Sequence, residues 1–289
     1  MKILEGFKNI VDKYEFFVFD IWGVIHDGTH LYPNVIETLQ YLKSQQRKIS
    51  FLSNAPRRAF RVEKILNQFG ITADLYDFVL TSGECTYLYL QQNQQLKFAN
   101  FKSKYLYIGP DKDLDLLEGL DYQKVSDPAQ ADFVLTTGFD HDNSQLSEKL
   151  PLAIQAHNFK LPMICVNPDL IVVRQNGAEM ICAGALALEY QKMGGVVHYF
   201  GKPYANVYDI LMAKYLLSDR KKFVAIGDGI ETDIKGACDF GIDSILVSSG
   251  IMSKELKVNF GVDVDLDSVS EVFNKYKIYP QYIISNLKI

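Results

Sequence analysis

The sequence predicts an α/β fold built on a parallel sheet, with a second α/β unit inserted into it. Short apolar runs alternate along the chain with segments of helical periodicity, which is the pattern of βαβ units. A length of 289 residues suggests two domains, at roughly 150 residues for each. The middle stretch has strand-like runs and helices of its own. We therefore expect the core to comprise residues 1–95 and 196–289, and the inserted unit residues 96–195.

The expected strands are short and apolar, and most of them end at a polar residue or a glycine. In chain order they are 15–19, 48–53, 78–83, 105–109, 133–138, 163–166, 198–201, 223–228 and 243–248. Between the first two strands, a helix is expected from Pro33, because Val35, Leu39 and Leu42 recur at helical spacing. A second helix is expected over 57–69, ended by Gly70.

Composition and charge exclude several classes of protein. Hydrophobic residues make up 48% of the chain and charged residues 22%, which is too apolar for a disordered chain. The net charge of −5 argues against nucleic acid as the main partner, since nucleic-acid binders usually carry a basic face. No signal peptide or membrane-spanning run is recognisable, and the four cysteines form no CxxC pair. These features predict a cytoplasmic protein with reduced thiols and no membrane partner.

Ligands of parallel sheets bind beyond the carboxyl ends of the strands, so the residues that follow the runs are the candidates for chemistry. Asp20 follows the run at 15–19, and Gly23 allows the backbone to turn closely around a ligand there. The Asp20 carboxylate is suited to attack an electrophile or to bind a hard cation. An ordinary aspartate in a loop after a strand is the alternative.

Two further strand ends carry groups that suit an anion. Ser53 offers a hydroxyl and Asn54 an amide, although the same two residues are also common helix caps. Lys202 stands between a glycine and a proline after the run at 198–201, where its ammonium is placed to neutralise an anion. A generic surface lysine is the alternative.

The run at 223–228 ends in the most specific of these patterns. Asp228 follows a glycine, and Asp233 comes five residues later, where a helix is expected to begin. Two carboxylates at this spacing suit Mg²⁺, which usually takes one or two protein carboxylates and keeps several waters. These acidic groups would repel a phosphate, and Lys202 together with the Ser53 donors would offset that repulsion.

The order of these groups resembles the haloacid dehalogenase-like hydrolase superfamily. Its four motifs are matched by DxxG at Asp20, SN at Ser53, GKP at Lys202 and GDxxxTD at Asp228. The long insertion between the second and third motifs resembles the class IIA branch, which includes nitrophenyl-phosphate, sugar-phosphate and pyridoxal-phosphate phosphatases. The resemblance covers nearly the whole chain and implies a Rossmann-like core with an α/β cap domain that sets substrate specificity.

The resemblance also assigns roles to the candidate residues. Asp20 is similar to the nucleophile that forms an aspartyl-phosphate during hydrolysis of a small phosphorylated metabolite. Asp20, the backbone carbonyl of Trp22 and Asp228 resemble Mg²⁺ ligands, and Asp233 resembles a supporting acid. The remaining matches, to phosphate-binding groups, are Ser53, the Asn54 backbone and Lys202.

One position departs from the phosphatase pattern. The family's phosphatases carry a second aspartate two residues after the nucleophile, which protonates the leaving group, and here that position holds Trp22. Indole has no proton that titrates near neutral pH, and general acid–base catalysis contributes about 10²–10⁴-fold. Slow turnover is therefore expected for poor leaving groups. His26 or Asp27 is a candidate surrogate acid, with a flap-loop pair of no catalytic role as the alternative.

The departure at Trp22 leaves other functions open. Dehalogenases of the superfamily carry an aromatic residue at this position and phosphonate-cleaving members an alanine, so carbon–halogen or carbon–phosphorus cleavage is one alternative. A protein that binds a phosphometabolite without turnover is another, with Trp22 as a hydrophobic wall.

The expected cap supplies further candidates. Asn167, Asp169 and Arg174 follow a strand, and the NPD segment at 167–169 resembles the cap loop near the active site of class IIA members. We expect Asn167 and Asp169 to face the substrate, with a packing or turn role for Pro168 and Asp169 as the alternative. Cap-to-cap dimers occur among relatives, so the resemblance allows a homodimer.

Overall fold

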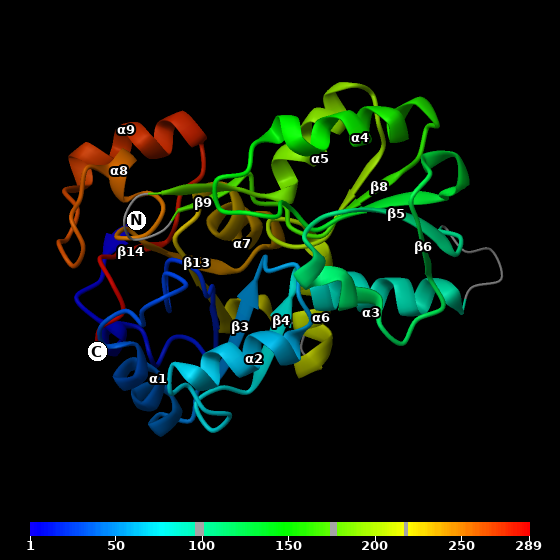
Figure 1. Ribbon diagram of the computed structural model, residues 1–289. Coiled ribbons are helices and arrows are strands. Elements are labelled where there is room, and N and C mark those ends of the chain that lie inside the picture. The colour runs from blue at the N-terminus through cyan, green and yellow to red at the C-terminus, as the bar shows by residue number, and fades with distance from the viewer. Residues whose placement is uncertain (96–100, 174–177, 217–218) are drawn as a thin grey trace.

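The computed structural model describes residues 1–95, 101–173, 178–216 and 219–289, and within them two parallel sheets lie side by side (Figure 1). In the larger sheet every neighbouring pair of strands is parallel. Its order is β1 (Lys2–Ile3), β14 (Tyr282–Ile284), β13 (Asp243–Val247), β12 (Phe223–Gly227), β2 (Phe16–Phe19), β3 (Lys48–Ser53) and β4 (Phe78–Thr81). This arrangement confirms the predicted α/β class.

Strand β2 shows how the sheet is covered on both faces. Phe17 and Phe19 point into one hydrophobic cluster and Phe16 and Val18 into another, as the alternation of side chains along a strand requires. All four side chains are buried, so both faces need helices. Helices α1 (Val35–Ser44) and α2 (Ala59–Gln68) cover the first face, and α3 (Ser82–Gln94), α6 (Ala205–Tyr215) and α7 (Lys235–Phe240) the second.

The smaller sheet is also parallel. Its order is β11 (Val197–Tyr199), β8 (Met163–Cys165), β7 (Phe133–Thr136), β5 (Lys104–Ile108) and β6 (Gln123–Val125). Helices α4 (Leu146–Asn158) and α5 (Ala183–Lys192) pack on one face through Ala153, Ala156, Leu186 and Tyr190. The other face joins the second cluster of the larger sheet. That these two sheets form separate domains, divided at 96–195, stays a prediction.

Strand β11 lies in a different sheet from the one that the sequence suggested. The run at 198–201 was expected within the 196–289 part of the core, whereas β11 pairs in parallel with β8, Tyr199 opposite Cys165. The smaller sheet therefore continues past residue 195. The physical reason is that a three-residue strand carries no pattern that identifies its partner, and its neighbour is decided by packing. Lys202 consequently follows a strand of the smaller sheet.

Several elements escaped the sequence analysis. A β-hairpin formed by β9 (Ile171–Val173) and β10 (Glu179–Ile181) is antiparallel and separate from both sheets. Helices α8 (Ser253–Leu256) and α9 (Leu266–Tyr276) pack with β14 around Leu246 and Phe273. None of the helices in the described ranges combines the length and apolar character that crossing a membrane requires.

The topology places a crevice at the carboxyl end of β2. From β2 the chain proceeds to β3 and β4 in one direction, and β12, β13 and β14 extend the sheet in the other. The order of strands thus reverses at β2 and β12, and open α/β sheets bind their ligands at such a point.

Candidate active site

Three carboxylates meet at this switch point. Asp20 directly follows β2 and Asp228 directly follows β12, the neighbouring strand. Asp233 lies on a π-helical turn, η5 (Ile230–Ile234), that leads into α7. One oxygen from each of these three side chains lies within 4.8 Å of the other two, and all three residues are buried. The structure therefore brings together the acidic residues that the sequence predicted to share a site.

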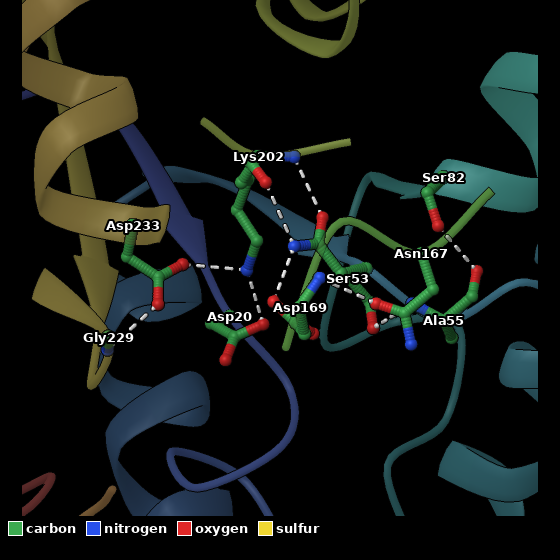
Figure 2. Close-up of polar contacts among 10 residues, drawn as sticks. Asp20, Ser53, Ala55, Ser82, Asn167, Asp169, Lys202, Gly229 and Asp233 are labelled. Atoms are coloured by element: carbon green, nitrogen blue, oxygen red, sulfur yellow. Dashed lines mark hydrogen bonds and ion pairs between the residues drawn. The ribbon is translucent and has the colours of Figure 1, made fainter. Parts of the chain in front are cut away.

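Lys202 neutralises part of this cluster. Its ammonium Nζ lies 2.5 Å from Asp20 Oδ1 and 2.6 Å from Asp233 Oδ1, and the side chain is only 4% exposed (Figure 2). The lysine reaches the core carboxylates from the loop after β11. Burial alone would lower the pKa of Lys202, but the carboxylates of Asp20 and Asp233 raise it, so the group stays an ammonium.

The cluster holds more negative than positive charge. When all three carboxyl groups are ionised, they face one ammonium, which leaves two negative charges unbalanced in a buried space. Burial raises the pKa of Asp20 to about 7, against the opposing effect of Lys202. Burial also raises the pKa of Asp228 well above its usual range, and the charges of Asp20 and Asp233 add to that shift. A divalent cation would balance this surplus, and oxygen donors are what Mg²⁺ prefers, so the residues fit the predicted metal.

The backbone around Asp228 leaves no room for larger residues. A Cβ on Gly23 or on Gly250 would collide with the Asp228 carboxylate, and Gly23 also has a positive φ of 84°. The Ile251 backbone N–H donates to Asp228 Oδ2 over 2.7 Å. Similarly, the Gly229 N–H donates to Asp233 Oδ2 over 3.0 Å. These contacts fix the direction in which both carboxylates point.

Replacing Gly23 by alanine is expected to have two effects: it strains the backbone and it displaces the Asp228 carboxylate. The strain of a positive φ costs roughly 1–3 kcal/mol, and the added methyl group must also displace Asp228. Gly194→Ala is the matched control, because Gly194 has a φ of 89° with nothing within 4 Å of the added Cβ. We expect Mg²⁺-dependent thermal stabilisation in the control and its loss in Gly23→Ala. Equal stabilisation in both variants would contradict the placement of Asp228 in the metal site.

Asn54 joins three chain segments through its side-chain amide. Its Nδ2 donates to Asp169 Oδ1 over 2.8 Å and to the Lys202 carbonyl over 3.0 Å, and its Oδ1 accepts from the Lys202 N–H over 2.7 Å. The Asn54 side chain therefore holds the Lys202 backbone in position through two hydrogen bonds. Ser53 ends β3, lines the cavity described below, and accepts from the Ala55 N–H through Oγ over 3.2 Å.

The predicted cap residues Asn167 and Asp169 reach the same place. They belong to the loop after β8, and Asn167 Oδ1 accepts from the Asp169 N–H over 3.0 Å. Burial raises the pKa of Asp169 to about 6, although its bond from Asn54 acts in the opposite direction. Arg174, the third candidate of the expected cap, lies outside the described residues.

Trp22 connects the loop after β2 to the β9–β10 hairpin. Its indole Nε1 donates to the Val173 carbonyl over 2.8 Å. The ring packs on Gly28 so closely that a Cβ there would collide with it. Trp22 also lines the cavity, which agrees with the hydrophobic-wall alternative for its side chain. The predicted role of its backbone carbonyl as a metal ligand stays a prediction.

The two candidate surrogate acids have local partners instead. His26 stacks on Phe69, its Nδ1 accepts from the Gly28 N–H, and burial lowers its pKa to about 4. Asp27 accepts from the backbone N–H groups of Thr29 and His30 and closes a turn. Neither residue lines the cavity that holds Asp20. These contacts give neither residue a partner in the cavity, and a role of His26 or Asp27 as proton donor stays a prediction.

A cavity of about 840 Å³ opens over the acidic cluster. Asp20, Ser53, Lys202 and Asp228 form its floor, and the loop after β8, the β9–β10 hairpin and the segment at 110–113 contribute walls. Sequence reasoning missed the hairpin, Gly250 and the Ile251 N–H, which no local pattern connects to the site. A carboxylate held by an ammonium at the floor of such a cavity is equipped for nucleophilic attack on a bound electrophile.

Comparisons with known proteins agree with this geometry. A family profile described as haloacid dehalogenase-like hydrolase matches residues 17–123, and a second one, described as HAD-hydrolase-like, matches residues 199–272. Together they include Asp20, Ser53, Lys202 and Asp228.

Similar proteins extend over nearly the whole chain. Phosphoglycolate phosphatase 2 of Arabidopsis thaliana is 25% identical over 91% of this chain and 92% of that protein. Sugar-phosphatase AraL of Bacillus subtilis is 27% identical over 88% of this chain and 90% of that protein. Among solved structures, a haloacid dehalogenase-like hydrolase from Brucella suis superposes with a TM-score of 0.82 at 28% identity, covering 99% of this chain and 100% of the other. The chain therefore belongs to the haloacid dehalogenase-like hydrolase family.

Proposed function

We propose that the protein is a Mg²⁺-dependent phosphatase that hydrolyses a small phosphorylated metabolite through an aspartyl-phosphate on Asp20. The observation that carries the proposal is the Lys202–Asp20 pair of 2.5 Å inside an acidic cluster at the floor of an 840 Å³ cavity. Similar proteins that are named as phosphatases, with phosphoglycolate and sugar phosphates in their names, support the phosphate monoester as the substrate class.

In the proposed first step the Asp20 carboxylate attacks phosphorus. A bond forms between a carboxylate oxygen and phosphorus, and the bond between phosphorus and the leaving oxygen breaks. Lys202 holds Asp20 Oδ1 in place and neutralises charge on the transferring group, with Ser53 as a further donor. Mg²⁺, when bound by Asp20 and Asp228 with Asp233 in support, supplies the positive charge that lets a phosphate approach these carboxylates.

The second step releases phosphate from Asp20. Water attacks the phosphorus of the aspartyl-phosphate, the bond to the carboxylate oxygen breaks, and the carboxylate is restored. Because Trp22 has no titratable proton, no side chain at that position protonates the leaving oxygen or acts as a base on the attacking water. We therefore expect faster turnover of aryl phosphates, whose leaving groups need little protonation, than of alkyl phosphates.

A metabolite screen tests the proposal. Release of inorganic phosphate from aryl and sugar phosphates is measured with Mg²⁺ and after chelation by EDTA. We expect activity with the metal and its loss with EDTA, restored by an excess of Mg²⁺. Phosphate release that EDTA leaves unchanged would contradict a metal-dependent mechanism.

Mg²⁺ affinity is expected to rise with pH. A carboxyl group must lose its proton to bind a metal, and the pKa of Asp20 is raised to about 7 before the metal binds. Protons therefore compete with Mg²⁺ below that pH, and affinity increases between about pH 6 and pH 8. Titration calorimetry in two buffers of different protonation enthalpy measures both the affinity and the protons released. An affinity that is constant over this range, without proton release, would show that Asp20 is already ionised or is not a ligand.

Trp22 supports a second candidate function. Because the indole N–H is already bonded to Val173, the side chain offers no proton relay to a ligand. A protein that binds a phosphorylated metabolite and turns it over very slowly would have this arrangement. Calorimetric binding of a phosphate ester without phosphate release over hours would favour this second function over the phosphatase.

A further inference from the structure

One wall of the cavity is basic and lies apart from the acidic floor. Arg57, which precedes α2, and Lys112, on the 3₁₀-helical segment η2 (Asp111–Leu117), line the large cavity together with Asp20. The same two residues also line an adjoining cavity of about 410 Å³, whose other lining residues are Arg61, Lys64 and Ile65. Two cationic side chains thus line both cavities, and two more line the smaller one.

The charges on this wall are only partly neutralised. Arg57 Nε lies 3.1 Å from Asp113 Oδ1, and Arg61 Nη2 lies 2.9 Å from Asp115 Oδ2. Among the residues that the structure describes, Lys64 and Lys112 have no ion pair with an acidic side chain. Of these two lysines, Lys112 lines both cavities and Lys64 only the smaller one. Asp113, on the same segment as Lys112, also lines the large cavity, but its carboxylate is paired with Arg57. Further acidic residues of this cavity lie on other elements, among them Glu231 on η5 and Glu255 on α8.

The basic groups are held in position. Asp113 is buried, so its bond to Nε anchors the Arg57 guanidinium, and a guanidinium has further N–H donors to offer. Arg61 Nη1 donates over 2.8 Å to the carbonyl of Lys112, which fixes the backbone that carries that lysine. A preorganised guanidinium beside an ammonium is a suitable site for a carboxylate or a phosphate.

We propose that the substrate carries a second anionic group, a carboxylate or a phosphate, which binds Arg57 and Lys112 while its reacting phosphoryl group lies at Asp20. This inference rests on the proposed phosphatase function and narrows its substrate class to phosphate monoesters with a distal negative charge. An anion at the far end of the ligand meets the unpaired charge of the wall, whereas an uncharged end gains no such contact.

The test compares esters that differ only at the distal end. Alkyl phosphates of increasing chain length are assayed beside the same esters with a terminal carboxylate and, in a second arm, with a terminal phosphate. We expect kcat/KM to favour the doubly anionic ester at one chain length by about tenfold, the value of one charge-assisted contact of about 1.4 kcal/mol. The arm that shows the preference identifies the anion.

Substitutions of Lys112 test whether the preference for the doubly anionic ester depends on the charge of this side chain. Lys112→Ala is expected to remove most of the preference and Lys112→Glu to reverse it, whereas Lys112→Arg retains it. Lys124→Glu is the matched control, since Lys124 is an exposed lysine of β6 that lines neither cavity. The preference should also weaken as ionic strength rises.

The outcomes separate this inference from the function on which it rests. If 4-nitrophenyl phosphate and plain alkyl phosphates are hydrolysed but no distal anion improves kcat/KM at any length, the distal site is wrong and the phosphatase stands. If Lys112→Glu retains the preference for the doubly anionic ester, the proposed distal site is also wrong. If no ester of either kind is hydrolysed, the proposed function itself fails.

Discussion

Asp20→Asn is expected to abolish phosphate release, by at least about 10⁴-fold, because an amide cannot form the aspartyl-phosphate. The substitution keeps the shape of the side chain and removes one of three clustered carboxylates. Lys202 keeps its contact with Asp233, so its ammonium does not lose every partner. We therefore expect the metal-free variant to be at least as stable to heat as the unmodified protein.

Two measurements decide this prediction. Phosphate release from 4-nitrophenyl phosphate gives the loss of activity, and a thermal unfolding curve shows that the fold is retained. Asp121→Asn is a suitable control, because Asp121 is an exposed aspartate of the chain that lines neither cavity. A folded Asp20→Asn variant with substantial activity would contradict Asp20 as the nucleophile.

Trp22→Asp is expected to increase turnover of alkyl phosphates. The substitution places a carboxyl group two residues after the nucleophile, where it can protonate the leaving oxygen and then activate water. General acid–base catalysis contributes about 10²–10⁴-fold, and the gain should be largest for the poorest leaving groups. The variant also loses the bond to Val173 and the packing on Gly28, so a lower melting temperature is expected.

A leaving-group series measures the effect. The ratio of kcat/KM for an alkyl phosphate to that for 4-nitrophenyl phosphate should rise in Trp22→Asp. Trp22→Phe is the matched control, because it also breaks the bond to Val173 but adds no acid, and its ratio should stay at the original value. An unchanged ratio in a folded Trp22→Asp variant would indicate that the missing acid is not what limits turnover.

The sequence predicted the floor of the site because parallel strands end at one edge of their sheet. Asp20, Ser53 and Asp228 each stand at the end of an apolar run, and β2, β3 and β12 prove to be neighbours. Asp233 could be placed as well, since it follows Asp228 at a fixed short distance along the chain. Lys202 reaches the predicted cluster from β11, a strand of the smaller sheet, which the short run at 198–201 did not indicate.

The remaining features depend on contacts between distant segments. The Trp22 indole meets the carbonyl of Val173, 151 residues away, and nothing in either local sequence signals that bond. Strands of two or three residues, such as β1, β9 and β14, are too short to show a period. From the sequence alone, His26 is a side chain that could titrate near neutral pH. The structure shows that it is buried against Phe69, and burial lowers its pKa.

The central claim is that Asp20, Asp228, Asp233 and Lys202 form one phosphoryl-transfer site around a divalent cation. A crystal structure with Mg²⁺ and beryllofluoride, which mimics a phosphoryl group on a carboxylate, tests it most directly. The account predicts beryllofluoride bonded to the Asp20 carboxylate, Lys202 Nζ beside it, and Mg²⁺ held by Asp20 and Asp228. An adduct on another side chain, or an ion bound away from these carboxylates, would contradict the account.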